Sequence, residues 1–187
     1  MQVTQTPLPG VLLFEPQTFS DNRGWFVESY NEQKYIQAGL TLKFVQDNHS
    51  YSTKNVVRGL HFQQQHPQGK LVRVVSGEVF DVAVDIRRGS PTFGQWYGVM
   101  LSATNKKQLY IPPSFAHGFS VMSEGAEFLY KCTDFYHPGD EIGLLWNDPQ
   151  VNVDWHLKGD PVLSEKDAIL PTLAEVNDRL PIYRNPK

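Results

Sequence analysis

The stretch LVRVVSGEVFDVAVDI, residues 71–86, carries the strongest structural signal in the chain. From Phe80 to Ile86 every second residue is large and apolar, while Asp81 and Asp85 lie on the other face. This period of two predicts a half-buried β-strand. The turn sequence Ser76-Gly77-Glu78 predicts a tight hairpin that pairs this strand with the apolar run before it.

A second pair of strands is predicted further along the chain. Apolar residues and His117 occupy alternate positions between Phe115 and Val121, and Glu124-Gly125-Ala126 has turn composition. The next strand, from Phe128 to Cys132, again places every second residue on one face. We therefore expect another hairpin here.

Short helices are predicted only outside this central region. Residues 31–38 form one candidate, with Asn31 as its cap. Residues 164–170 and 172–180 each begin with a capping residue, and the second has capping-box spacing between its first and fourth residues. Short strands joined by turns rich in glycine and proline, with few helices, predict a mainly β fold: a sandwich or jelly roll that binds ligands between its sheets.

The bulk composition excludes several classes of protein. A length of 187 residues predicts a single domain, residues 1–187, with ordinary shares of hydrophobic (40%) and charged (20%) residues. The net charge of −3 gives no footprint for duplex nucleic acid or an anionic membrane, although local arginines can still bind phosphate. Cys132 is the only cysteine, the first ten residues do not resemble a signal peptide, and no apolar run could span a bilayer, so we expect a cytoplasmic protein.

Two polar segments in the first third of the chain are candidate binding sites. Residues 21–28 include Arg23, Phe26 and Glu28 in a strand-like setting. Taken alone, this segment is more often a turn followed by an edge strand. Residues 46–50, beginning with Gln46 and containing Asn48, are dense in hydrogen-bonding groups that could read a sugar or a base. Taken alone, a polar loop is the favoured interpretation of this segment.

The next candidates surround the first predicted hairpin. Arg58 suits phosphate because its guanidinium is a planar fork of donors. His61 lies between Leu60 and Phe62 in an apolar strand, where a lone histidine is more often structural than catalytic. Lys70 opens an apolar strand and could simply extend its ammonium to the surface.

The last candidates lie in the second half of the chain. Residues 110–119 and 130–136 mix aromatic and polar side chains, but Tyr130 alone could be a buried tyrosine with a bonded hydroxyl. Asp167 follows Ser164 by three residues, where an acidic residue stabilises a helix start.

Together these residue types suit proton transfer beside a carbonyl. Histidine, such as His61, is a base near neutral pH, and a carboxylate such as Asp167 can orient it and stabilise its charged form. Lys70 could neutralise an enolate oxygen, and Tyr130 could return the proton from another side. Arginines could hold a diphosphate, and an aromatic ring could stack on a base. Spacing along the chain does not show that these groups meet.

Seven motifs in fixed order connect these residues to a known family. They are D-x-R-G-x-F-x-E at 21–28, Q-x-N at 46–48, R-G-L-H-F-Q at 58–63, K-L-V-R-V at 70–74, P-x-x-x-A-H-G-F at 112–119, Y-K-C-T at 130–133 and S-x-K-D at 164–167. Each motif is weak alone. As an ordered set covering nearly the whole chain, they resemble the dTDP-4-dehydrorhamnose 3,5-epimerases.

The resemblance implies a cupin-type jelly roll that works as a homodimer. It also implies conversion of dTDP-4-dehydro-6-deoxy-D-glucose to dTDP-4-dehydro-L-rhamnose, by epimerisation at carbons 3 and 5 through enolates, in dTDP-L-rhamnose synthesis. His61 matches the proton acceptor, Asp167 its partner, Tyr130 the proton donor and Lys70 the lysine near the ketone. Tyr136 matches the aromatic residue that stacks on thymine, and the segment from Arg23 to Glu28 can come from the neighbouring chain. The other substrate-contacting positions are Arg23, Phe26, Glu28, Gln46, Asn48, Arg58, His117, Glu141 and Lys166.

No metal or cofactor is expected. Metal-binding cupins usually present His-x-His, whereas this chain reads His61-Phe62-Gln63. With His117 as the only other candidate of this kind and no set of thiolates, a tight transition-metal site is not predicted. Proton transfer needs no nicotinamide, and no glycine-rich dinucleotide fingerprint is present.

Two alternatives remain open at this point. A mono-epimerase or a ketoisomerase of a related dTDP-sugar pathway would share the fold and differ in the carbon that is reprotonated. A non-catalytic sugar-nucleotide-binding cupin would bind the ligand without exchanging protons with solvent. In each case we expect His61, Lys70, His117 and Tyr130 to point into one cavity.

Overall fold

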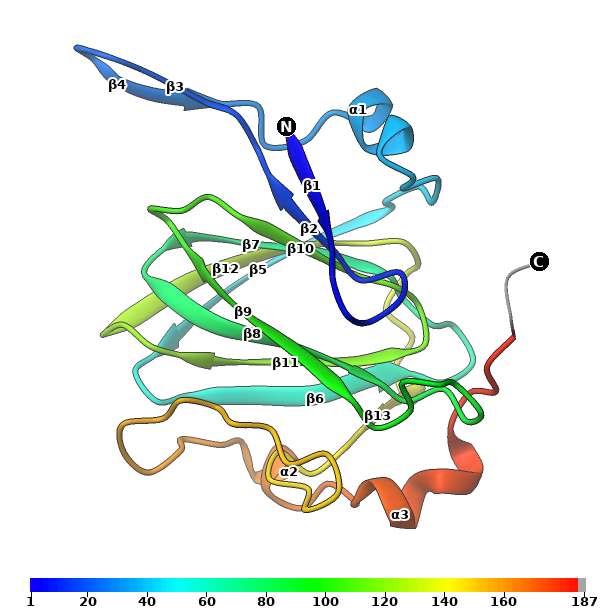
Figure 1. Ribbon diagram of the computed structural model, residues 1–187. Helices are drawn as coiled ribbons and strands as arrows, with labels where there is room; N and C mark the ends of the chain where they lie inside the picture. The colour runs from blue at the N-terminus through cyan, green and yellow to red at the C-terminus, as the bar shows by residue number, and fades with distance from the viewer. Residues whose placement is uncertain (185–187) are drawn as a thin grey trace.

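Two antiparallel β-sheets lie face to face in the computed structural model, which describes residues 1–184 (Figure 1). The first sheet has the order β1 (Gln2–Gln5), β2 (Leu12–Glu15), β10 (Gln108–Ile111), β7 (Lys70–Ser76), β12 (Gly125–Cys132) and β5 (Gln46–Thr53). The second has the order β13 (Glu141–Gly143), β6 (Val57–Gln63), β11 (Phe115–Val121), β8 (Glu78–Asp85) and β9 (Trp96–Ser102). The predicted mainly β sandwich is confirmed, and in the described residues its sheets stay open rather than closing into a barrel.

Both predicted hairpins are wrong, because each turn carries the chain from one sheet to the other. β7 pairs with β10 and β12, whereas β8 pairs with β11 and β9. Likewise β11 and β12 belong to different sheets. The two turns touch at Gly77, where φ is +75° and an added Cβ would collide with the carbonyl oxygen of Gly125. Glycine is required at this corner because it tolerates positive φ and leaves room for the neighbouring backbone.

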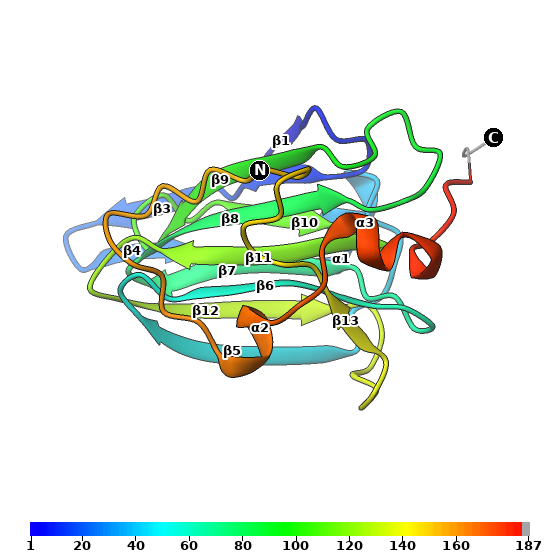
Figure 2. The same ribbon diagram turned by 90° about the horizontal axis from the view of Figure 1, so that it is seen from below.

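The prediction that β8 is half-buried is also wrong, because both of its faces are covered. Val79 and Ala83 pack in the core between the sheets. Phe80, Val82 and Val84 pack in a second core on the other side of the sheet. Figure 2 shows the C-terminal segment crossing that outer face, and its residues Trp155, Leu173, Val176 and Leu180 complete the second core. Asp81 and Asp85 are consequently fully buried.

The helices form where capping residues predicted them. α1 (Glu32–Gln37) begins after Asn31, whose side chain accepts a hydrogen bond from the Lys34 amide. Near the C-terminus lie α2 (Glu165–Ala168), α3 (Leu173–Val176) and the 3-10 helix η1 (Asn177–Arg179). The capping box of Thr172 and Glu175 is present. α2 is shorter than predicted because Pro171 disfavours helical geometry at the residue before it.

A two-stranded hairpin extends away from the sandwich (Figure 1). It consists of β3 (Thr18–Asp21) and β4 (Gly24–Val27), which pair only with each other. Phe19, Trp25 and Phe26 on this hairpin are 55%, 61% and 66% exposed. Single exposed apolar residues are common, but three large ones on one projecting hairpin mark an interaction surface.

Candidate active site

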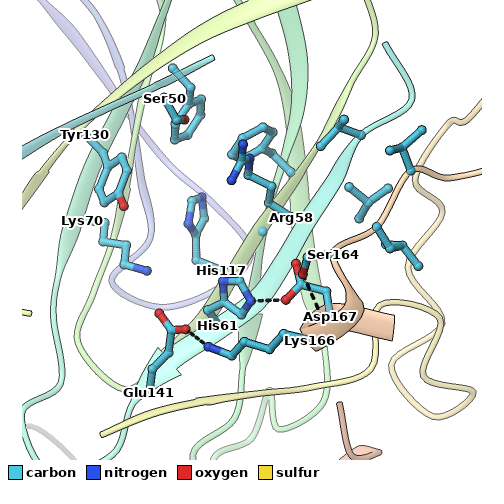
Figure 3. A pocket seen from close by; sticks show the side chains of 17 residues that line it. Ser50, Arg58, His61, Lys70, His117, Tyr130, Glu141, Ser164, Lys166 and Asp167 are labelled. Atoms are coloured by element: carbon cyan, nitrogen blue, oxygen red, sulfur yellow. Dashed lines mark hydrogen bonds and ion pairs between the residues drawn. The ribbon is translucent and has the colours of Figure 1, made fainter. Parts of the chain in front are cut away.

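A cavity of about 430 Å³ opens between the two sheets and is bordered by the segment before α2 (Figure 3). His61, Lys70, His117 and Tyr130 all line it, as the sequence led us to expect. The first and third lie on β6 and β11 of one sheet, and the other two lie on β7 and β12 of the facing sheet. The remaining lining residues are Ser50, Val56, Val57, Arg58, Gly118, Phe119, Phe128, Glu141, Val162, Leu163, Ser164, Lys166 and Asp167.

His61 and Asp167 form a close pair at one wall of this cavity. The His61 Nε2 atom lies 2.6 Å from Oδ1 of Asp167, whose side chain is almost fully buried. Burial alone raises the pKa of Asp167, but the hydrogen bond and charge of His61 and the hydrogen bond from the Gly59 amide oppose it, and that pKa lies below its usual range. A charged carboxylate accepts a hydrogen bond from the Nε2–H group, so Nε2 keeps its proton. Nδ1 of His61 is then the nitrogen that can take up another proton.

The short helix α2 explains how a residue 106 positions away reaches His61. Ser164 caps the helix by accepting a hydrogen bond of 3.0 Å from the Asp167 backbone amide. The backbone of Asp167 therefore belongs to the helix start, while its side chain bonds to His61. The predicted contact with His61 and the predicted position at a helix start are therefore found in the same residue.

The backbone of β6 approaches β11 unusually closely beside this pair. Gly59 has φ of +101°, and an added Cβ would lie 2.5 Å from the carbonyl oxygen of His117. The strand register is irregular here, and it places His61 directly opposite His117. Only glycine allows this approach, so Gly59 helps to set the relative position of the two histidines.

Lys70 and Tyr130 lie together on the opposite wall. The Lys70 Nζ atom is 5.9 Å from the centre of the Tyr130 ring. Burial lowers the pKa of Lys70, and the neighbouring Cys132, Glu141 and Asp81 oppose that effect only in part. Burial also raises the pKa of Tyr130 to about 12. The phenol therefore keeps its proton at neutral pH and has one to donate.

His117 forms a second histidine–carboxylate pair deeper in the sandwich. Its Nε2 atom lies 2.9 and 3.1 Å from the two carboxylate oxygens of Asp81, which is fully buried on β8. No role was predicted for Asp81 from the sequence. The sequence did contain a signal, because Asp81 is a charged residue inside an apolar strand. Such residues are almost never fully buried without a partner, so a partner for Asp81 could have been expected.

Charged residues surround the mouth of the cavity. The Arg58 Nε atom donates to Ser52 Oγ at 2.9 Å, and its guanidinium remains accessible beside the cavity. Lys166 forms an ion pair with Glu141, and that hydrogen bond raises the pKa of Lys166 (Figure 3). Two cations near the opening suit an anionic group such as a diphosphate.

Gln46, Asn48 and Tyr136 are not among the cavity-lining residues. Gln46 donates to Asn48 at 3.2 Å and accepts a hydrogen bond of 2.9 Å from the Tyr136 backbone amide. Gln46 therefore holds the loop that carries Tyr136, whose ring is 50% exposed. An exposed, anchored ring is suited to stacking against a planar ligand.

Arg23, Phe26 and Glu28 are also absent from the residues that line the cavity of their own chain. The first two lie on the projecting hairpin, where Arg23 pairs with Asp21 at 2.6 Å. Glu28 follows the hairpin and pairs with Lys34 at 2.6 Å.

Within residues 1–184, no group of three or more histidine, cysteine, aspartate or glutamate side chains is arranged to hold a metal ion. The same residues include no helix with the length and apolarity needed to cross a bilayer.

Comparisons with known proteins agree in pointing to one family. The family model described as dTDP-4-dehydrorhamnose 3,5-epimerase matches residues 5–175. A dTDP-4-dehydrorhamnose 3,5-epimerase from Pseudomonas aeruginosa is 59% identical over 168 residues, which cover 89% of this chain and 93% of that protein.

Solved structures extend the comparison to the fold. The 3,5-epimerase of Legionella pneumophila in complex with dTDP-4-keto-L-rhamnose superposes with a TM-score of 0.95, at 51% identity and 98% coverage of both chains. A 3'-monoepimerase from Streptomyces bikiniensis in complex with dTDP-quinovose has a TM-score of 0.89 at 31% identity, covering 96% of this chain and 93% of that one.

Proposed function

Because the chain belongs to the dTDP-4-dehydrorhamnose 3,5-epimerase family, we propose that it converts dTDP-4-dehydro-6-deoxy-D-glucose to dTDP-4-dehydro-L-rhamnose. One observation within the chain carries this proposal: a histidine–carboxylate pair faces a lysine and a protonated tyrosine across a single cavity. Inverting a carbon beside a ketone requires a base, a charge for the enolate oxygen and an acid on the opposite face. The cavity contains one candidate for each task.

His61 is the proposed base, and Asp167 holds its ring and stabilises the imidazolium that forms. Lys70 places its ammonium at the enolate oxygen. Tyr130 returns a proton from the opposite side. The separation of His61 and Tyr130 on facing sheets supports this division, because a sugar ring between them would have one group on each face. One base acting alone would return the proton to the face from which it was removed.

The nucleotide part of the substrate is proposed to bind at the mouth of the cavity. Arg58 and Lys166 are available for the diphosphate, while His117 and Glu141 are available for sugar hydroxyls. Tyr136 would stack on the thymine, with Gln46 and Asn48 forming the polar wall next to it. The single cysteine, Cys132, is buried and unpaired, which is consistent with our proposal of a cytoplasmic enzyme that needs no cofactor.

We further propose a homodimer in which the hairpin of each copy completes the site of the other. Arg23 and Phe26 project away from their own sandwich, and the cavity of the same chain lacks them. Burying Phe19, Trp25 and Phe26 against a second copy would remove a large apolar area from water. A twofold arrangement would then deliver both hairpins at once.

Mixing two impaired variants tests whether the hairpin of one copy completes the site of the other. Arg23→Ala should lower kcat/KM by about tenfold or more, the usual scale for a lost charge-assisted hydrogen bond. If Arg23 acts in the partner, a heterodimer of Arg23→Ala with His61→Asn contains one intact site and one doubly defective site. After random subunit exchange we expect about a quarter of wild-type activity. Activity that stays at the mean of the two separate variants would show that Arg23 acts within its own chain.

Deuterium exchange separates double epimerisation from the alternatives. In heavy water we expect proton NMR to show deuterium at both carbon 3 and carbon 5 of the product, with both centres inverted. A mono-epimerase, like the 31% identical relative, would invert one centre only. A sugar-binding protein without catalysis would give no exchange at all, although calorimetry would still detect dTDP binding.

A further inference from the structure

Asp81 has no part in the chemistry proposed above, yet its carboxylate lies in the interior of the sandwich. It is fully buried on β8, which pairs with β11 so that Asp81 lies opposite Phe119 and diagonal to His117. Burying an unpaired carboxylate is costly, so a residue of this kind needs a specific partner. Both oxygens of Asp81 lie within hydrogen-bonding distance of Nε2 of His117, at 2.9 and 3.1 Å.

This contact determines which nitrogen of His117 can meet a ligand. A carboxylate only accepts hydrogen bonds, so Nε2 must carry the proton. The neutral ring then has its lone pair on Nδ1, which has no hydrogen-bond partner among residues 1–184. His117 lines the cavity. By fixing the proton on Nε2, Asp81 therefore determines whether the ring offers a hydrogen-bond acceptor or a donor to the sugar.

The same carboxylate also acts on Lys70 from the facing sheet. The Asp81 charge favours the protonated form of Lys70, against the burial that disfavours it. Two other acidic groups, Cys132 and Glu141, act in the same direction. The remaining titratable or charged groups at the cavity are Arg58, His61, His117, Tyr130, Lys166 and Asp167. Glu141 is also paired with Lys166, and Asp81 makes the smallest of the three acidic contributions to the charge state of Lys70.

We propose that Asp81 is a positioning residue, which fixes the tautomer of His117 through their hydrogen bonds and contributes to the positive charge of Lys70. The proposal rests on the proposed epimerase function, because that function gives Lys70 its need for a positive charge. Asp81 itself touches neither the substrate nor the reacting atoms.

β8 provides a matched control in Asp85. Asp85 is equally buried, but it accepts hydrogen bonds from Arg87, Ser90 and Thr92. None of these partners is among the cavity-lining residues of the described chain. Asp85→Asn therefore measures how replacing a buried aspartate of β8 by asparagine affects stability, without a change at the cavity.

The pH profile of the full-length enzyme is the first test. Loss of the Asp81 charge lowers the pKa of Lys70, so the alkaline limb of kcat against pH should move to lower pH in Asp81→Asn. The Tyr130 pKa of about 12 keeps phenol ionisation clear of that limb. Asp85→Asn should lower the melting temperature and leave the limb in place. An alkaline limb equally unmoved in both variants would overturn the effect on Lys70.

The tautomer of His117 is the second test, and it needs no substrate. In wild-type protein labelled with ¹⁵N-histidine, the neutral His117 ring should carry its proton on Nε2, with the signal assigned by its loss in His117→Gln. Asp81→Asn should weaken or reverse that preference. An Nδ1-protonated ring in the wild-type protein would overturn the proposal even if Asp81→Asn does not fold. A wild-type protein without turnover would refute the epimerase function instead, and the tautomer result would still stand.

Discussion

His61→Asn is expected to lower kcat at least about a hundredfold, the usual scale for removing a general base. His61→Gln should lose as much activity, although its longer side chain keeps an amide donor that can reach Asp167, whose carboxylate would otherwise be left buried and unpaired. The loss should therefore be chemical rather than structural. Deuterium uptake at carbons 3 and 5 should fall with kcat, while calorimetry should show dTDP binding close to wild type. Turnover near the wild-type rate would end the assignment of His61 as the base.

Asp167→Asn is the companion variant, because Asp167 both bonds to His61 and sits in the first turn of α2. Loss of its charge should slow turnover, since the imidazolium is no longer stabilised. The Ser164 hydrogen bond goes to the Asp167 backbone and survives the change. An unchanged rate with a lowered melting temperature would show that Asp167 serves only the helix.

Lys70→Met should reduce deuterium wash-in at both carbons by about a hundredfold or more, comparable to the loss of one oxyanion-stabilising donor. Methionine keeps an unbranched apolar chain beside Tyr130, so the change removes the charge and disturbs the packing little. Without the ammonium no enolate is stabilised, and neither centre should exchange. Measurement of exchange in recovered substrate, alongside product formation, makes this loss visible as a defect before inversion.

Tyr130→Phe is the comparison variant for Lys70→Met, because it should impair product formation more than proton exchange. His61 and Lys70 remain, so proton abstraction should continue, but the acid on the opposite face is missing. Exchange with retention of configuration should then outrun product formation. Equal loss of exchange in Lys70→Met and Tyr130→Phe would contradict separate roles for the two residues. Inversion at both centres by Tyr130→Phe at the wild-type rate would show that another group supplies the proton.

Local patterns predicted the strands and helix caps well and their pairing poorly. The caps at Asn31 and Thr172 form as expected, since a capping bond spans only a few residues. Ser76-Gly77-Glu78 has hairpin composition, yet it leads from one sheet to the other. Glycine satisfies the backbone in both kinds of turn, so the sequence of the turn cannot distinguish them. The distinction depends on contacts such as that between Gly77 and Gly125, 48 residues away along the chain.

The residues of the candidate site were likewise predicted where the motifs were sufficient and missed where contacts distant in sequence decide their environment. His61, Lys70, His117 and Tyr130 converge on one cavity, and the predicted pairing of His61 with Asp167 is present. Asp81 was missed because the alternation in β8 indicated a solvent-facing side, whereas the C-terminal segment covers one face and the opposite sheet covers the other. The ordered motifs placed Arg23 in the site, whereas the structure places it on the projecting hairpin, outside the cavity of its own chain.

The two corners near Gly77 have a consequence for how this enzyme could diverge. The corner between β11 and β12 places Tyr130 on the layer opposite His117 and its strand partner His61, and the spacing of such layers in sandwiches is about 10 Å. Phe119 and Phe128 lie between the layers beside the cavity, with stacked rings 4.3 Å apart. These two rings act as a spacer that sets the gap available to a sugar. Substitutions in the spacer could admit a different sugar, or favour one stereocentre over the other, while every proton-transferring residue stayed the same.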